Sequence, residues 1–251
     1  MSTWIFLRGL TREARHWGDF PDAFCRQIPD AQILTLDLPG NGVHHRLTSP
    51  LSVEAMADFC RREAQDQGVQ MPCRILAMSL GAMVAVAWAA AYPKEVAGCV
   101  LINTSLRPFS PFHHRLRPCN YPLLLRLALL GADDDKWEEA IYDLTSRRPD
   151  LRRETVEQWV RYRQTRPVSR INALRQLAAA ARFRAPRREP SARLLVLASA
   201  SDALVDPRCS RKLAPAWCAD FAEHPNAGHD IPLDDGPWVA QRVRDWLAVP
   251  R

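Results

Sequence analysis

Short apolar runs alternate with stretches of helical periodicity along most of this 251-residue chain, and this alternation constrains the fold more than any other feature. The runs contain β-branched and aliphatic residues, as strands do, and apolar residues recur at helical spacing between most of them. This pattern predicts an α/β fold with a short, mostly parallel sheet of about six strands flanked by helices. The expected strands are 4–7, 32–36, 73–77, 98–102, 193–198 and 218–222, and the expected helices are 17–26, 52–67, 80–91, 207–214 and 238–247.

The alternation breaks once, after the run at 98–102, where helical patterns follow one another without a convincing strand. The expected helices of this insertion are 122–131, 133–146, 150–166 and 168–183. Loops at the carboxyl ends of parallel strands carry the active site in such sheets, so the insertion is expected to cover that site as an all-helical cap. We therefore divide the chain into a core (1–104), a helical cap (105–190) and the rest of the core (191–251).

The charge of the chain is concentrated in this insertion. The whole sequence has 34 basic and 28 acidic residues, and 18 of the basic but 10 of the acidic ones lie between Leu106 and Pro190. Either the cap has a solvated basic surface, or it attracts an acidic substrate or partner. The pI of about 9.2 also fits nucleic-acid binding, but no nucleic-acid motif accompanies it, so no nucleic-acid partner is expected.

The cysteines and the apolar runs exclude several other classes of protein. Seven cysteines are scattered without C-x-x-C spacing, which suggests neither a disulfide framework nor a zinc site, and no metal or cofactor is expected. We expect them to be mostly buried small hydrophobic residues. No apolar stretch reaches the length of a membrane span, and the first residues lack the pattern of a signal peptide. The chain is therefore expected to be cytoplasmic, without a membrane partner.

The strongest local signal is CRILAMSLGAMVAVAWAAAY, in which a strand runs through A-M-S-L-G directly into a helix. It matches the nucleophile-elbow pattern, with Ala77 in place of the first glycine. A serine at this sharp turn has a strained backbone, and its neighbours two positions away must be small, as Ala77 and Gly81 are. Ser79 is thus the candidate nucleophile, and the alternative is a serine that merely caps a buried helix.

A serine hydroxyl needs a base within hydrogen-bond reach and an acid that orients the base. Asp202 follows the expected strand at 193–198, and His229 follows the one at 218–222. Asp206 is the rival acid, but it stands where it would cap the next helix. His224 is the rival base, and its place at a strand end favours a structural role.

With these residues in place, nearly the entire chain resembles the α/β-hydrolase superfamily, and it is generally similar to esterases that act on pimeloyl-carrier-protein methyl ester. The order Ser79, Asp202, His229 agrees with that family, as do the D-x-x-V-x-P-like context of the acid and the G-H context of the histidine. The turn in LTLDLPGNG also matches. The resemblance implies an α/β-hydrolase fold and a catalytic triad, and a serine nucleophile sets the chain apart from the branches that use aspartate.

The same resemblance implies an oxyanion hole formed by the backbone amides of Leu10 and Leu80. In the family the loop that supplies the first amide usually begins with His-Gly, whereas this chain has Arg8 before its glycine. Arg8 either anchors the loop through a salt bridge or presents a positive charge near the site.

The expected activity is that of a serine esterase, which cleaves a carboxylic ester or a thioester through an acyl-enzyme on Ser79. The arginine-rich cap suggests an acidic acyl substrate, or one carried by an acyl carrier protein or coenzyme A. Cap aromatic residues either line an acyl pocket or pack the cap onto the body. Candidate substrate or partner contacts are Arg8, Arg152, Arg153, Trp159 and Arg161. The alternatives are a carbon–carbon bond hydrolase, a lyase or a perhydrolase on the same triad, and a non-enzymatic small-molecule receptor.

Overall fold

A six-stranded, all-parallel sheet forms the centre of the computed structural model, which describes residues 2–130 and 133–249. The order of the strands is β2-β1-β3-β4-β5-β6, so the chain reverses direction across the sheet between β2 and β3. Loops that follow β1 and β3 therefore start side by side at the carboxyl edge, which is where open α/β sheets bind ligands. The strands are β1 (Ser2–Leu7), β2 (Ala31–Leu36), β3 (Cys73–Met78), β4 (Val96–Ile102), β5 (Arg193–Ser199) and β6 (Asp220–His224).

Helices cover both faces of the sheet because alternate strand residues face opposite sides. Trp4 and Phe6 of β1 pack with α1 (Phe20–Gln27) and α10 (Ile231–Ala248) on one face. On the other face, Ile5 and Leu7 pack with the second group of helices. That group consists of α2 (Val53–Asp66), α3 (Leu80–Ala91) and α9 (Arg208–Ala216). The predicted α/β class and number of strands are confirmed.

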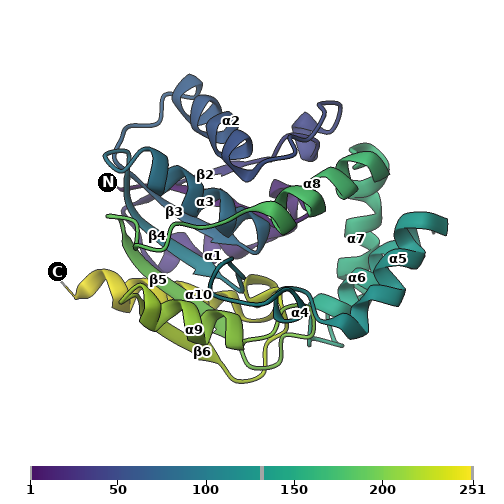
Figure 1. The fold of residues 1–251 in the computed structure, drawn as a ribbon. Coiled ribbons are helices and arrows are strands. Elements are labelled where there is room, and N and C mark those ends of the chain that lie inside the picture. Colours follow the sequence, from purple (N-terminus) through teal and green to yellow (C-terminus); the bar gives the residue numbers. More distant parts are fainter. Residues whose placement is uncertain (1, 131–132, 250–251) are drawn as a thin grey trace.

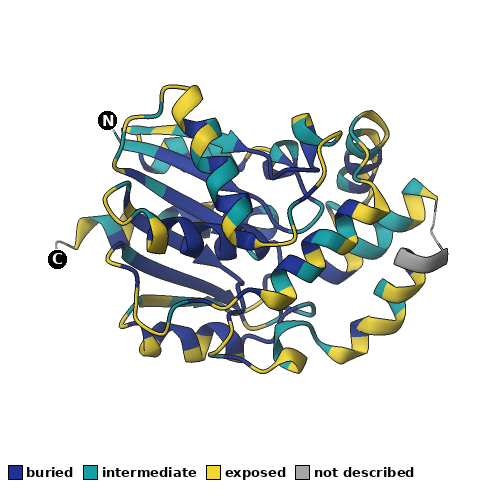
Figure 2. Ribbon diagram, turned by 45° about the horizontal axis from the view of Figure 1, so that its top comes forward, coloured by how far each residue is buried: buried dark blue, intermediate teal, exposed yellow. Residues whose placement is uncertain are grey.

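The insertion between β4 and β5 is helical, as predicted. Its helices are α4 (Phe112–Arg115), α5 (Tyr121–Leu130), α6 (Asp134–Thr145), α7 (Arg152–Thr165) and α8 (Arg170–Arg182). Figure 1 shows α5 to α8 beyond one end of the sheet, while both chain ends lie at the opposite side. In Figure 2 the central strands are buried and the outward faces of these helices are exposed. The proposed boundaries of the cap at residues 105 and 190 stay a prediction.

Several expected elements differ from the structure at their ends. The helix expected at 17–26 is α1, and a 3-10 turn, η1 (Ala14–Trp17), precedes it. The last strand lies two residues later than expected, at Asp220–His224. The last helix is expected at 238–247, and α10 is interrupted just before it at Asp235, a non-helical residue whose carboxylate accepts a hydrogen bond from the Trp238 amide at 3.1 Å. A short helical segment from Ile231, capped by the Asp230 carboxylate, which accepts from the Leu233 amide, precedes the expected helix. Two further 3-10 turns are η2 (Gly42–His44) and η3 (Pro118–Asn120).

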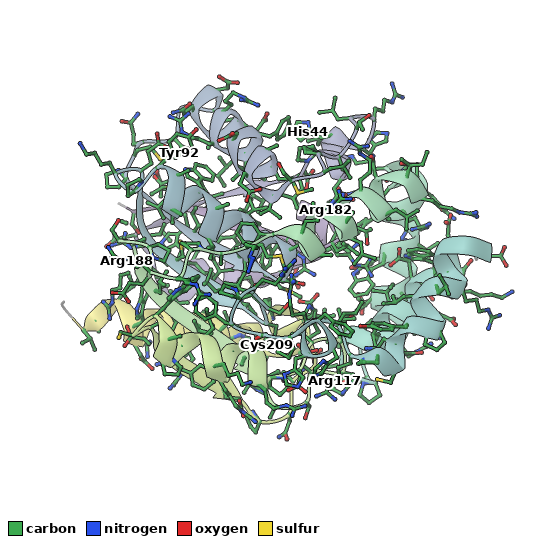
Figure 3. The ribbon with its side chains drawn as sticks, viewed as in Figure 1. His44, Tyr92, Arg117, Arg182, Arg188 and Cys209 are labelled. Atoms are coloured by element: carbon green, nitrogen blue, oxygen red, sulfur yellow. The ribbon has the colours of Figure 1, made fainter. Side chains whose placement is uncertain are left out.

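The cysteines divide into buried and exposed groups. Cys60, Cys73, Cys99 and Cys209 are buried, as expected, and Figure 3 labels Cys209 on α9. Burial raises the pKa of these thiols, that of Cys73 to about 12. Cys25 is half-buried and Cys119 and Cys218 are exposed, so the expectation of mostly buried cysteines holds for four of the seven. In the part of the chain that the structure describes, no helix is both long and apolar enough to cross a membrane.

Candidate active site

Ser79 lies at the sharp turn between β3 and α3, as the sequence pattern predicts. Its φ and ψ are +53° and −115°, a strained conformation for a residue with a side chain, with a cost of about 1–3 kcal/mol. The turn is held by the Ser79 amide, which donates to the Ile102 carbonyl at 2.9 Å. Ala77 is fully buried, and a Cβ on Gly81 would lie 2.5 Å from the carbonyl oxygens of Leu7 and Arg8. Position 81 therefore requires a residue without a side chain.

Asp202 and His229 form a buried pair. The imidazole Nδ1 of His229 lies 2.7 Å from Oδ2 of Asp202, and each residue is 2% exposed. The other carboxylate oxygen accepts hydrogen bonds from the amides of Leu204 and Val205, at 2.8 and 2.9 Å. A carboxylate can only accept, so Nδ1 carries the proton and Nε2 is left as a proton acceptor. This is the tautomer that a general base needs.

The rival acid and the rival base have other partners. Asp206 accepts from the backbone amide of Arg208 and pairs with its guanidinium at 2.6 Å, and this pair lowers the pKa of Asp206 to about 2. His224 packs against Trp238, and its Nε2 lies 3.2 Å from the carboxylate of Asp235. Neither residue is paired with His229 or Asp202, so the geometry favours the predicted acid and base.

The loops that carry Leu10 and Leu80 meet beside the nucleophile. A Cβ on Gly9 would lie 3.2 Å from Cβ of Ser79, so the loop after β1 runs close to the elbow. Leu80 is the first residue of α3, whose amide has no acceptor within its own helix. Among residues 2–130 and 133–249, neither the Leu10 nor the Leu80 amide donates to another protein group. Both are available to a ligand.

Arg8 forms a buried salt bridge, one of the two arrangements expected for it. Its guanidinium donates to both carboxylate oxygens of Asp230, at 3.1 and 2.5 Å, and stacks over Trp17 at 4.7 Å. Both partners of the pair are 2% exposed. Because Asp230 follows His229 directly, this salt bridge joins the loop after β1 to the loop that carries the base.

A cavity of about 1330 Å³, including its open mouth, lies over Ser79 and His229. Its walls are mostly apolar, and the cap supplies much of them. Cap residues in the lining include Leu124 from α5, Trp137 and Ile141 from α6, and Leu174, Leu177 and Ala180 from α8. The candidate nucleophile and base thus share an apolar, half-enclosed chamber.

Four arginines also reach this cavity, and they differ in their partners. Arg8 is paired with Asp230, and Arg12 donates to Glu138 at 2.5 Å. Arg115 instead donates to backbone carbonyls at the end of α8, at 2.6 and 3.3 Å, and burial lowers its pKa. Arg170 is exposed at the start of α8. Within the described part of the chain, no carboxylate lies within 4.0 Å of the Arg115 or Arg170 guanidinium.

The expected cap contacts lie outside the lining of this cavity. Trp159 is 3% exposed in a cluster with Tyr142 inside the cap, and the Arg12 guanidinium lies 4.2 Å from its ring centroid. Arg152 pairs with acidic residues of α6, and the Arg153 side chain is 92% exposed. Arg161 is exposed on α7. The structure thus places Trp159 in the core of the cap, outside the lining of the cavity.

The sequence analysis did not predict the buried side chains that connect the loop after β1 to other parts of the chain. Asp230, Glu138 and Gln176 all contact the loop after β1, and each is far from it along the chain. Asp230 alone carried a local signal, because an acidic residue before I-P is a helix cap. Among the described residues, no cluster of three or more His, Cys, Asp or Glu side chains could hold a metal ion.

Comparisons with known proteins bear on the family and the fold of the chain. A family model described as "Alpha/beta hydrolase family" matches residues 4–242. A putative non-heme bromoperoxidase from Mycobacterium tuberculosis H37Rv is similar in structure, with a TM-score of 0.78 and 21% identity over 99% of this chain and 92% of that one.

Two esterases are also similar in structure. One, a thermophilic esterase from Thermogutta terrifontis, has a TM-score of 0.74 and 22% identity, with 98% of this chain and 89% of that chain covered. The other, from Rhodococcus sp. ECU1013, has a TM-score of 0.76 and 17% identity, with 98% and 90% covered. No curated protein sequence matches the chain significantly. At these identities, the structural likeness supports the fold alone.

Proposed function

The chain belongs to the α/β-hydrolase family, and from that premise we propose that it is a serine hydrolase that cleaves a carboxylic ester or thioester through an acyl-enzyme on Ser79. The observation that carries the proposal is the buried Asp202–His229 pair, which opens into the same apolar cavity as a serine held at a strained turn. The two esterases among the similar structures agree with this reaction class.

In the proposed mechanism, His229 Nε2 takes the hydroxyl proton of Ser79 as Oγ attacks the acyl carbon. Asp202 stabilises the imidazolium that forms, and the amides of Leu10 and Leu80 donate to the oxygen that becomes negatively charged. His229 then gives the proton to the departing alcohol or thiol. Water repeats the sequence on the acyl-enzyme, which releases the acid and restores Ser79.

The lining of the cavity guides the substrate part of the proposal. Apolar walls favour a substrate with a hydrocarbon acyl or alcohol portion. Arg115, a partly buried guanidinium without a carboxylate partner among the described residues, supports an acidic group on that substrate. A carrier protein or coenzyme A stays a prediction, since Arg153 and Arg161 lie outside the cavity on exposed parts of α7.

A perhydrolase is the second candidate, in which peroxide replaces water in the second half of the reaction. The putative bromoperoxidase among the similar structures favours this alternative over the carbon–carbon hydrolase and the lyase. Peroxide-dependent halide oxidation in the presence of a carboxylic acid would identify it.

If the protein is a receptor, it would bind ligands in the cavity without turnover.

The first experiment is labelling with a fluorophosphonate probe, followed by a chain-length series of p-nitrophenyl esters. The wild type should label, and Ser79→Ala and His229→Ala should not, because the probe needs an activated hydroxyl. Ser201→Ala is a matched control, since this serine lies in the Asp202 loop and donates to the Pro225 carbonyl at 3.2 Å. A wild type that fails to label would overturn the proposal and favour the receptor.

A further inference from the structure

The turn that presents the Leu10 amide has an unusual backbone. Residues 9–12 form a turn that is closed by a hydrogen bond from the Arg12 amide to the Gly9 carbonyl, at 3.2 Å. Thr11, the third residue of the turn, has a φ of +58°. That value belongs to a type II turn, whose third position is normally occupied by glycine or asparagine. A β-branched residue does not favour this conformation, so other contacts must hold the turn.

A fully buried side chain from the cap supplies such a contact. Gln176 on α8 accepts a hydrogen bond from the Thr11 amide through Oε1, at 2.9 Å. Its Nε2 donates to Oδ1 of Asn41 at 2.7 Å, and Nδ2 of Asn41 donates to the Arg12 carbonyl at 2.8 Å. One chain of side-chain amides thus binds the Thr11 amide and the Arg12 carbonyl, which belong to the two residues directly after Leu10.

On the basis of the proposed function, we propose that Gln176 is a positioning residue that holds the Leu10 amide in place for the oxyanion. The oxyanion site is then complete only while α8 lies against the body. Leu177 and Ala180 of the same helix line the cavity. Movement of α8 away from the body would therefore widen the chamber and release the turn at the same time. Substrate entry and oxyanion stabilisation are linked through this helix.

The same helix offers a matched control. Asn172, one turn before Gln176, is also buried and also joins α8 to the body. It accepts from the Ser49 amide and donates to the Leu47 carbonyl, both at 2.9 Å, without touching the turn at 9–12. Replacing Asn172 therefore weakens the attachment of α8 but leaves the direct contact to Thr11 in place.

The test compares Gln176→Met, which keeps the length of the side chain but removes its hydrogen bonds, with Asn172→Ala. Gln176→Met should lower kcat for a neutral p-nitrophenyl ester by about 10- to 100-fold, because loss of a whole oxyanion donor costs about 10²- to 10³-fold. KM should change by less than about threefold. The Ki of an alkyl boronic acid, which forms a tetrahedral adduct on serine, should rise by the same factor as kcat falls. Asn172→Ala should keep kcat within about threefold of the wild type.

Two further measurements separate positioning from stability. Thr11→Gly added to Gln176→Met should recover part of the lost kcat, because glycine adopts a positive φ without strain. Hydrogen exchange of the peptide covering residues 8–13 should be faster in Gln176→Met than in Asn172→Ala. The proposal would be overturned if the two single variants lost kcat equally and in proportion to their loss of Tm. It would also be overturned if Gln176→Met showed faster exchange but an unchanged kcat. A wild type without ester turnover would refute the proposed function instead, and exchange would still show whether Gln176 holds the turn.

Discussion

The loops at the carboxyl end of the sheet and the helices of the cap enclose the same cavity, but they are held in place by different means. In the body, each candidate catalytic residue follows a strand, and Asp202, which holds His229, is fixed by the nearby amides of Leu204 and Val205. In the cap, position depends on buried side-chain pairs between residues more than 100 positions apart, such as Arg12 with Glu138. The body thus carries the candidate catalytic residues, and the cap shapes the cavity above them.

The sharpest test of the body's part in this comparison is Asp202→Asn. An amide in that position would favour the wrong tautomer of His229, and kcat should fall by about 10⁴-fold while the fold is kept. Ester hydrolysis and circular dichroism would measure the two effects. Asp206→Asn, in the same loop but paired with Arg208, is the matched control and should keep kcat within about threefold. If the control lost activity instead, Asp206 would be the acid.

A smaller effect, on stability, is expected in the cap from Glu138→Gln. The change leaves the Arg12 guanidinium buried without a carboxylate, and removal of one partner of a buried pair costs about 3–5 kcal/mol. Urea unfolding would measure the loss. Glu157→Gln breaks an exposed pair with Arg153 on α7 and should cost less than about 1 kcal/mol. Equal losses in the two variants would mean that the Arg12 pair does not hold the cap.

The smallest effect concerns pH. His16 lies between the body and the cap, beside Arg12 and against Trp159 and Tyr162. Its burial, and after that the positive charge of Arg12, hold its pKa well below the usual value. The unfolded chain therefore binds a proton near pH 6.5 that the folded chain does not. Stability should fall as the pH drops below that value, by about 1 kcal/mol between pH 7 and 5.5.

Urea unfolding at several pH values would reveal this dependence. His16→Gln should flatten the slope near pH 6, because the titrating group is gone. His45→Gln, which removes a histidine that contacts the Gly42 carbonyl away from the cap, should leave the slope unchanged. The same slope in the wild type and in His16→Gln would contradict the prediction.

The same division between body and cap decides what could be predicted from the sequence. Ser79 carries a local signature, because the turn requires small neighbours two residues away on each side. Strand and helix patterns likewise placed Asp202 and His229 at the ends of β5 and β6, and α3 within its true bounds. Each of these features depends on residues close together in the chain.

Contacts between residues far apart in the chain lacked such a signal. The partner of Arg8 is 222 positions away, and nothing near either residue in the sequence points to the other. For Trp159 the sequence leaves both a substrate contact and cap packing open, because helical spacing marks an apolar face without showing whether that face lines a cavity or packs inside the cap. Gln176 reads as an ordinary polar residue of an amphipathic helix, and its role depends entirely on the tertiary contact with Thr11.

The uneven exposure of the cysteines has a practical consequence for following the cap. Cys119 lies in η3, directly before α5, and Cys218 follows α9 on the body, and both are exposed. The buried thiols have raised pKa values and react slowly with alkylating reagents near neutral pH. With the half-buried Cys25 replaced by serine, spectroscopic labels attached to the thiols at positions 119 and 218 would therefore report the distance between the cap and the body during turnover.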